Sequence, residues 1–218
     1  MLLRALTAAL VVLALCPRAS AADADAGLYA PAPPPGSAFV RAINAAPSGS
    51  GVPVRIHDRS LAAVVPGQGT PYVPVPQGKA AVVAGGSSWS ADVEAGHFYT
   101  VAFGLTSGGA AFRTLADPAF SSLAKARLAL YNLSSTSGLG LTTSDASVTI
   151  LTSVPAWTVS SREVNALTVG LAVQGPAGLV ATFPATSLVR AAAYSVVVRE
   201  TEKGLVGSWV PSATSTAD

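Results

Sequence analysis

The chain has 218 residues, of which 50% are hydrophobic and only 11% are charged. Two of its 13 basic residues, Arg4 and Arg18, precede every acidic residue, so the remainder of the chain carries 11 basic and 11 acidic side chains. A balanced chain has no long-range field that would attract nucleic acid, an anionic membrane or a polyanionic polysaccharide. The composition therefore excludes a partner recognised by bulk charge, and we expect no nucleic-acid partner.

Residues 1–21 have the pattern of a signal peptide. Arg4 precedes an uncharged run from Ala5 to Leu15, and Ala19-Ser20-Ala21 is the small-x-small sequence that a signal peptidase cleaves. The apolar run is too short for a membrane-spanning helix, which needs about 20 residues, so we expect cleavage, no remaining transmembrane segment and export to the periplasm. The one cysteine, Cys16, follows Leu15 rather than a small residue, which makes a lipoprotein signal the weaker alternative, and the mature chain would contain no cysteine.

Residues 22–36 are rich in Ala, Asp and Pro and are expected to form an extended arm, because proline fixes φ and lacks an amide donor. After them, short β-branched and aromatic runs alternate with Gly, Pro, Ser and Asn about every ten residues, which is typical of a β-sandwich. No window outside the leader has a sustained helical period. The strands expected in this half are 39–45, 52–56, 61–65, 72–75, 80–84, 89–93, 98–103 and 110–115.

Residues 117–124 interrupt this rhythm, which restarts at Lys125. We therefore predict an all-β fold of two consecutive immunoglobulin-like β-sandwich domains, residues 37–116 and 125–211, joined by the short linker 117–124. Residues 212–218 are small and polar and are expected to form a flexible tail. The strands expected in the second half are 127–133, 140–143, 147–151, 157–160, 166–173, 179–183, 192–199 and 205–210.

The two halves also resemble each other in sequence. The first opens with a run that ends at Asn44 and the second with a run that ends at Asn132, and Tyr99 occupies the place in the first half that Tyr194 occupies in the second. This indicates a duplicated sandwich, in which each Asn ends its opening strand by bonding its own backbone and each Tyr packs inward. The alternative is coincidence in a chain rich in Val and Ala.

Candidate catalytic groups are few. A general base needs an orienting partner, and His57 lies beside Asp58, but neighbouring side chains of a strand point to opposite faces, so this pair is predicted to be a polar hairpin end. His97 follows Glu94 by three residues, but the glycine before it indicates a turn that enters a strand. The segment 104–108 has the glycines of a nucleophile elbow with Thr instead of Ser at its centre, and is predicted to be a hairpin turn.

Two histidines without a mature cysteine do not form a recognisable zinc site, and no glycine-rich phosphate loop opens a helix. Asp92 and Glu94 could in principle act as paired carboxylates, but they share one short segment beside a turn and are better explained as solvated charges. We therefore predict no catalytic residues, no metal site and no cofactor. Trp89, Trp157 and Trp209 could stack on sugar rings, with packing in the core as the alternative for each.

Several segments resemble the AlgF family of alginate O-acetylation proteins. The sequence Leu28-Tyr29-Ala30-Pro31, followed by Gly36-Ser37-Ala38-Phe39-Val40-Arg41 and Asn44, is similar to that family's mature start. Asp117-Pro118-Ala119-Phe120 and Leu128-Ala129-Leu130-Tyr131-Asn132-Leu133-Ser134 resemble its interdomain segment and the opening of its second domain, although the first domain is longer here and lysines are few. The resemblance implies a non-catalytic partner of the periplasmic and membrane-bound acetyltransferases that decorate alginate.

The function expected from the sequence is therefore a non-catalytic periplasmic adaptor in O-acetylation of an exopolysaccharide, either alginate or a related acetylated polymer such as cellulose. Its expected partners are polysaccharide O-acetyltransferases, with the polysaccharide as an optional further ligand. The first alternative is a secreted carbohydrate-binding β-sandwich module. The end of the first strand, Asn44-Ala45-Ala46-Pro47, resembles the end of the opening strand in secreted sandwich modules. The second is an esterase or acetyltransferase that uses His57 or His97. The sequence assigns no binding residues.

Overall fold

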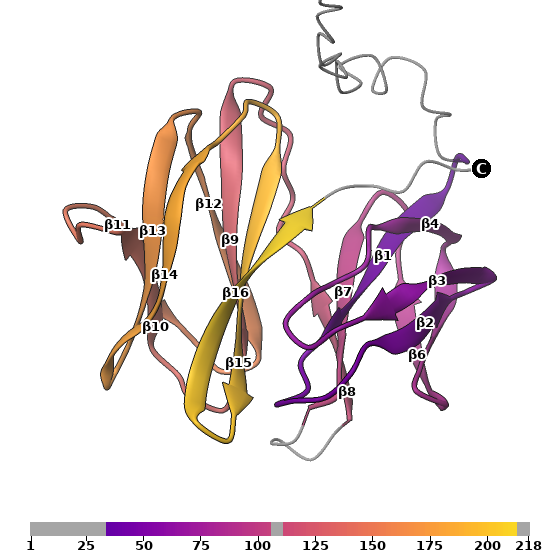
Figure 1. The fold of residues 1–218 in the computed structure, drawn as a ribbon. Helices are drawn as coiled ribbons and strands as arrows, with labels where there is room; N and C mark the ends of the chain where they lie inside the picture. The colour runs from indigo at the N-terminus through magenta and orange to yellow at the C-terminus, as the bar shows by residue number, and fades with distance from the viewer. Residues whose placement is uncertain (1–33, 106–110, 213–218) are drawn as a thin grey trace, which may run out of the picture. The chain divides into compact units, whose positions relative to one another are not determined.

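The computed structural model describes residues 34–105 and 111–212, which form sixteen β-strands and no helix (Figure 1). The predicted leader, most of the predicted arm and most of the predicted tail lie outside the described residues. The described residues all lie in one compact unit. The described residues contain no helix with the length and hydropathy needed to cross a membrane.

The first sandwich consists of the sheets β4-β1-β7-β8 and β3-β2-β5-β6 (Figure 1). β1 runs parallel to β7, and the other neighbouring strands are antiparallel. Because side chains alternate between the two faces of a strand, one face of each sheet supplies a core made mostly of Val and Ala. The strands are β1 (Ser37–Asn44), β2 (Val52–Ile56), β3 (Arg59–Val64), β4 (Val73–Pro76), β5 (Gly78–Ala84), β6 (Ser87–Val93), β7 (Phe98–Phe103) and β8 (Phe112–Ala116).

The second sandwich consists of the sheets β12-β9-β15-β16 and β11-β10-β13-β14. β9 runs parallel to β15, and the other neighbouring strands are antiparallel. Its core contains larger side chains, with five buried leucines in its central strands. The strands are β9 (Lys125–Leu133), β10 (Leu139–Thr143), β11 (Thr149–Val154), β12 (Thr158–Asn165), β13 (Thr168–Gly175), β14 (Gly178–Ser187), β15 (Ala193–Thr201) and β16 (Gly204–Ser212).

The two sandwiches have the same topology, because adding eight to each strand number of the first gives the strand order of the second. Asn44 and Asn132 play the same part in each. Each side-chain oxygen accepts a hydrogen bond from the backbone two residues later, at 3.0 and 3.2 Å, and each amide donates to the carbonyl of the last residue of β3 or β11. The predicted asparagine turns are confirmed.

Tyr99 and Tyr194 also correspond, since both are half-buried against the core of their own sandwich. Each hydroxyl accepts a hydrogen bond from the backbone amide five residues earlier, Glu94 at 3.1 Å and Val189 at 2.8 Å. Such a bond ties the loop before the strand to the strand itself. The structure therefore supports a duplicated sandwich.

Every strand expected from the sequence is present, but several are longer than expected, and the largest differences are in β12 and β14. β14 continues past Phe183 to Ser187 although Pro184 cannot donate a ladder hydrogen bond. Pro184 is tolerated because β14 is an outer strand of its sheet, where one side of the backbone has no hydrogen-bonded neighbour. β12 continues to Asn165, with the exposed Arg162 and Glu163 on an outer strand.

Candidate functional site

Strands β1 and β9 are buried almost throughout, which one sandwich alone would not achieve. One face of each strand points into the core of its own sandwich. The other face contributes to a third apolar cluster that combines residues of both sandwiches, so the two bodies are joined by a continuous packed contact. The buried members of this cluster are Ile43, Ala45, Ala102, Leu115, Ala129, Tyr131, Leu133, Val197 and Val210.

A fully buried arginine, Arg41 of β1, lies at this contact. Its Nε donates to Thr100 Oγ1 at 3.0 Å, its Nη2 to Ser195 Oγ at 3.0 Å and its Nη1 to Ser212 Oγ at 3.3 Å. Thr100 belongs to the first sandwich, whereas the two serines belong to β15 and β16 of the second and are 2.8 Å apart. The guanidinium therefore connects the two sandwiches through hydroxyl groups.

Two tyrosine rings enclose the charge of Arg41. The guanidinium carbon lies 4.7 Å from the centre of the Tyr72 ring and 4.9 Å from that of Tyr131. Both hydroxyls then donate to Asp117, Tyr72 at 2.6 Å and Tyr131 at 2.7 Å, and Thr100 Oγ1 lies within hydrogen-bond distance of the same carboxylate. The Thr100 hydroxyl thus accepts a hydrogen bond from Arg41 and donates one to Asp117. We call this set the interface network: Arg41, Tyr72, Thr100, Asp117, Tyr131, Ser195 and Ser212.

The interface network keeps Arg41, Tyr72 and Tyr131 in fixed charge states. Burial by itself disfavours the charge of Arg41, but Tyr131, Tyr72 and Asp117 outweigh this effect and raise the pKa of the guanidinium. Burial raises the pKa of Tyr72 and of Tyr131, and the Asp117 carboxylate adds to the effect. Both phenols therefore stay protonated and continue to donate to Asp117.

Further arginines support the same contact. Arg199 of β15 donates from Nη1 to the carbonyls of Ala46 and Pro47, at 2.8 and 2.9 Å, and desolvation lowers its pKa. The Arg113 guanidinium of β8 lies 5.2 Å from the centre of the Trp157 ring. Arg127 Nη1 donates to the Pro118 carbonyl of the segment between the sandwiches. Several of the few basic residues are thus used to hold the two bodies together.

The network suits a structural joint better than a reactive centre. Each oxygen of Asp117 already accepts from a hydroxyl, and each nitrogen of Arg41 is directed at a hydroxyl oxygen. Its central groups are buried, so a substrate would have to displace existing partners. Satisfied buried polar groups of this kind define a unique packing arrangement.

The candidate catalytic residues lie elsewhere. His57 and Asp58 form the exposed turn between β2 and β3, as the sequence predicts, and His57 has the positive φ of 54° that such a turn requires. His97 is exposed in the turn before β7, where its amide donates to the Glu94 carbonyl. The structure does not bring either histidine into the interface network. Part of the predicted turn at 104–108 lies outside the described residues.

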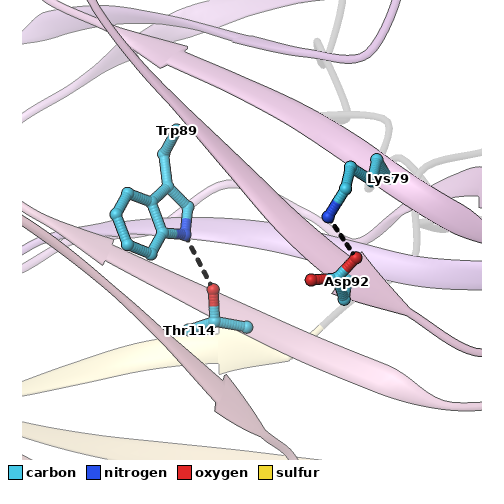
Figure 2. A network of polar contacts seen from close by, with 4 residues as sticks. All are labelled: Lys79, Trp89, Asp92 and Thr114. Atoms are coloured by element: carbon cyan, nitrogen blue, oxygen red, sulfur yellow. Dashed lines mark hydrogen bonds and ion pairs between the residues drawn. The ribbon is translucent and has the colours of Figure 1, made fainter.

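The described residues contain no group of three or more His, Cys, Asp or Glu side chains placed to hold a metal ion. Asp92 is exposed on β6 and pairs with Lys79 of β5, with 2.6 Å between Lys79 Nζ and Asp92 Oδ1 (Figure 2). Glu94 is exposed in the following turn. Asp92 and Glu94 are therefore solvent-exposed charges at the end of β6, in agreement with the prediction.

The three tryptophans differ in their surroundings. Trp209 packs between Phe183 and Tyr194 against the second core, and Trp157 lies under Arg113. Trp89 of β6 is 37% exposed; its Nε1 donates to Thr114 Oγ1 of β8 at 2.9 Å (Figure 2), and its ring stacks on Phe112. Only this ring combines a fixed orientation with substantial exposure.

Sequence reasoning missed the interface network because its members are distant in the chain. Arg41 is separated from Ser195 by 154 residues and from Ser212 by 171. One local signal was available: Arg41 interrupts the apolar run of Ala38, Val40, Ala42 and Ile43, which is unusual for a strand unless the charge is paired. Asp117 appeared only as the first residue of the expected linker.

Comparison with known proteins identifies the family. A family model described as "Alginate O-acetyl transferase AlgF" matches residues 10–195. The alginate biosynthesis protein AlgF of Azotobacter vinelandii is 32% identical over 189 residues, which cover 87% of this chain and 84% of that protein. Solved structures of the C-terminal and N-terminal domains of AlgF from Pseudomonas aeruginosa are 26% and 29% identical, cover 40% and 39% of this chain and 98% of each domain, and have TM-scores of 0.37 and 0.31. The chain belongs to the AlgF family.

Proposed function

We propose that this chain is a non-catalytic adaptor of alginate O-acetylation that holds acetyltransferase partners together in the periplasm. The description of its family and the names of its relatives support the pathway. The observation that carries the adaptor role is the interface network, which uses the buried Arg41 and Asp117 and the hydroxyl groups around them to join two sandwiches. By contrast, His57 and His97 lie on separate exposed turns.

Open sheet edges offer the surfaces for such partners. β3 is an outer strand, and a groove of about 410 Å³ runs beside it, lined by residues 61–65 and 68–71. Ala62 and Ala63 are exposed there, so small side chains leave the backbone accessible. An extended segment of a partner can add to an outer strand through main-chain hydrogen bonds. This groove is our first candidate for an acetyltransferase contact.

The periplasmic location rests on the expected leader at residues 1–21. Export can be measured by fractionating cells that produce the full chain and a chain without residues 1–21. The full chain should appear in the periplasmic fraction at reduced mass, whereas the shortened chain should stay in the cytoplasm. Recovery of the full chain at its original mass would contradict cleavage.

The adaptor role predicts a specific loss. Deletion of the gene should leave polymer yield unchanged and remove the acetyl signals from the NMR spectrum of the polymer, and the tagged chain should co-purify with acetyltransferases. A His57→Ala and His97→Ala double variant should restore full acetylation, because neither residue is assigned a chemical role. Loss of acetylation in that variant, together with turnover of a chromogenic acetyl ester by the purified wild-type chain, would instead identify an enzyme.

A carbohydrate-binding module is the second candidate, and Trp89 is the observation that favours it. Its indole is fixed by Thr114 and Phe112 and remains partly exposed. Calorimetry with bare and acetylated alginate oligosaccharides tests this role. Binding that Trp89→Ala abolishes and Trp209→Ala preserves, in folded variants, would favour the module over the adaptor.

A further inference from the structure

The second sandwich contains an apolar cavity of about 170 Å³ at one end. Leu128, Ile150, Val169 and Leu188 contribute to its walls, so both sheets and the loop after β14 take part. Val148 and Leu167 also line it but are 55% and 48% exposed, which places them at the mouth. The cavity is therefore an opening into the apolar core rather than a sealed packing defect.

The size of this cavity matches one large side chain. A cavity of about 150 Å³ lined by aliphatic residues stays dry and can bind benzene. The same space accommodates the ring of a phenylalanine or the branched end of a leucine. When an apolar group enters the cavity, both that group and the side chains of Val148 and Leu167 lose contact with water. This burial of apolar surface favours binding.

A second cavity of about 340 Å³ adjoins the first and has a different character. The two share Val148, Ile150, Val164 and Asn165, and the second adds Lys125 and Arg162. Arg162 Nη1 lies 3.3 and 3.2 Å from the carbonyl oxygens of Thr149 and Ile150, to which it donates. These bonds hold its positive charge across the space between the outer strands β11 and β12.

Two acidic residues lie near this mouth. Glu163 lines the second cavity and lies opposite Arg127 in the register of β12 and β9, on the face that also carries Lys125, whereas Arg162 lies opposite Leu128 on the face that packs into the core. Asp145, in the neighbouring hairpin turn, accepts hydrogen bonds from Thr143 and Ser147. Of the charged residues that line the second cavity, Lys125 and Arg162 are cationic and Glu163 is anionic, so the lining carries a net positive charge beside the apolar cavity.

We propose that these joined cavities, which we call the anchor pocket, bind one large apolar side chain of an extended partner segment that carries a carboxylate next to that side chain. The apolar cavity takes the side chain, and Lys125 and Arg162 attract the carboxylate. A cavity that fits one side chain favours a protein segment over the flat surface of a membrane, and its walls are mainly aliphatic, with Thr143 and Asn165 as the polar members, rather than rich in the polar groups that orient a sugar. This inference names a contact of the proposed adaptor and so rests on that function.

The test uses the full purified chain and a capped peptide of sequence Gly-Asp-Phe-Asp-Gly. Its addition should shift the methyl resonances of Val148, Ile150 and Leu167 in a saturable manner. A peptide with Ala in place of Phe should bind at least tenfold more weakly, because it leaves the hole unfilled. A peptide with Lys in place of both Asp residues should also bind at least tenfold more weakly, because it meets Lys125 and Arg162.

Matched variants locate the site. Leu167→Asp and Lys125→Glu should each weaken binding of the acidic peptide at least fivefold. Leu179→Asp and Lys203→Glu make the same changes at exposed positions outside the anchor pocket and should leave binding within twofold of wild type. Unchanged thermal unfolding in all four variants would show that each one is folded.

Three results would overturn the inference. The first is absence of methyl shifts with the Phe peptide, and the second is equal binding of the Ala peptide. The third is a chain that binds none of the peptides but binds phosphatidylglycerol vesicles through Leu167. This result would show that this end of the second sandwich contacts a membrane. Failure of the adaptor role is distinguishable, because a gene deletion that leaves acetylation intact would not change the peptide titration.

Discussion

The two sandwiches share one topology but differ at the positions where they meet. Counting back from the equivalent Asn44 and Asn132, Arg41 corresponds to Ala129 and Ile43 to Tyr131. The first sandwich thus supplies a buried cation where the second has a small residue, and the second supplies an aromatic ring where the first has an aliphatic chain. The two surfaces share one strand arrangement, and complementary residues at these positions allow them to bind each other.

The largest loss of stability should come from Arg41→Ala, which places in the first sandwich the residue type that the second has at Ala129. It leaves the Asp117 carboxylate buried without its cation and opens space between the Tyr72 and Tyr131 rings. We expect a loss of about 3–5 kcal/mol in the free energy of unfolding, measured by urea denaturation. A loss below about 1 kcal/mol would contradict a central role for the network.

A surface pair provides the control for that variant. Lys79→Ala removes a cation that pairs directly with Asp92 at 2.6 Å, but the two side chains are 71% and 80% exposed. Such a pair contributes about 0–1 kcal/mol.

A double variant with Arg41→Met and Asp117→Leu should be more stable than either single variant, because no unpaired charge remains buried.

Alkaline pH should weaken the contact between the sandwiches through the two enclosed tyrosines. Their folded-state pKa values are raised, so above about pH 10 the unfolded chain releases protons that the folded chain retains. Stability is therefore complete below that pH and falls above it, by about 1.4 kcal/mol per pH unit for each tyrosine.

Urea unfolding between pH 9 and 11, with phenolate absorbance recorded in parallel, measures this slope. A double Tyr72→Phe and Tyr131→Phe variant should start from lower stability at pH 8 and lose less of it as the pH rises. An equal slope in wild type and variant would show that these hydroxyls titrate in the folded state as they do in water.

The strands and their turns could be predicted from the sequence because their causes are local. Short β-branched and aromatic runs between Gly, Pro, Ser and Asn marked the strands, and the asparagine turns at Asn44 and Asn132 depend on residues two positions apart. The interface network and the anchor pocket could not be predicted, because each forms only when segments distant in the chain come together. Asp117 acquires its role through residues such as Tyr72 and Tyr131, which belong to different sandwiches.

The equivalent asparagines offer a finer comparison. The Asn132 amide donates to the carbonyls of Thr136, Val154 and Pro155, whereas the Asn44 amide donates to Val64. Buried carbonyls that lose a donor remain unsatisfied. We expect Asn132→Ala to cost about 3 kcal/mol and Asn44→Ala about 2 kcal/mol, measured by chemical unfolding. The reverse order would mean that the loop after β9 rearranges to satisfy its own carbonyls.

The smallest effect should come from the two equivalent tyrosines, where the same change can be made in each sandwich. Tyr99→Phe and Tyr194→Phe keep the ring against the core and remove only the hydroxyl that accepts from the amide of Glu94 or Val189. Because these amides are exposed enough for water to replace the lost partner, each variant should lose about 1 kcal/mol. Amide hydrogen exchange gives the sharper measurement: protection should fall at Glu94 in one variant and at Val189 in the other. If either substitution lowered protection in both sandwiches, the two loops would be coupled through the interface network rather than held independently.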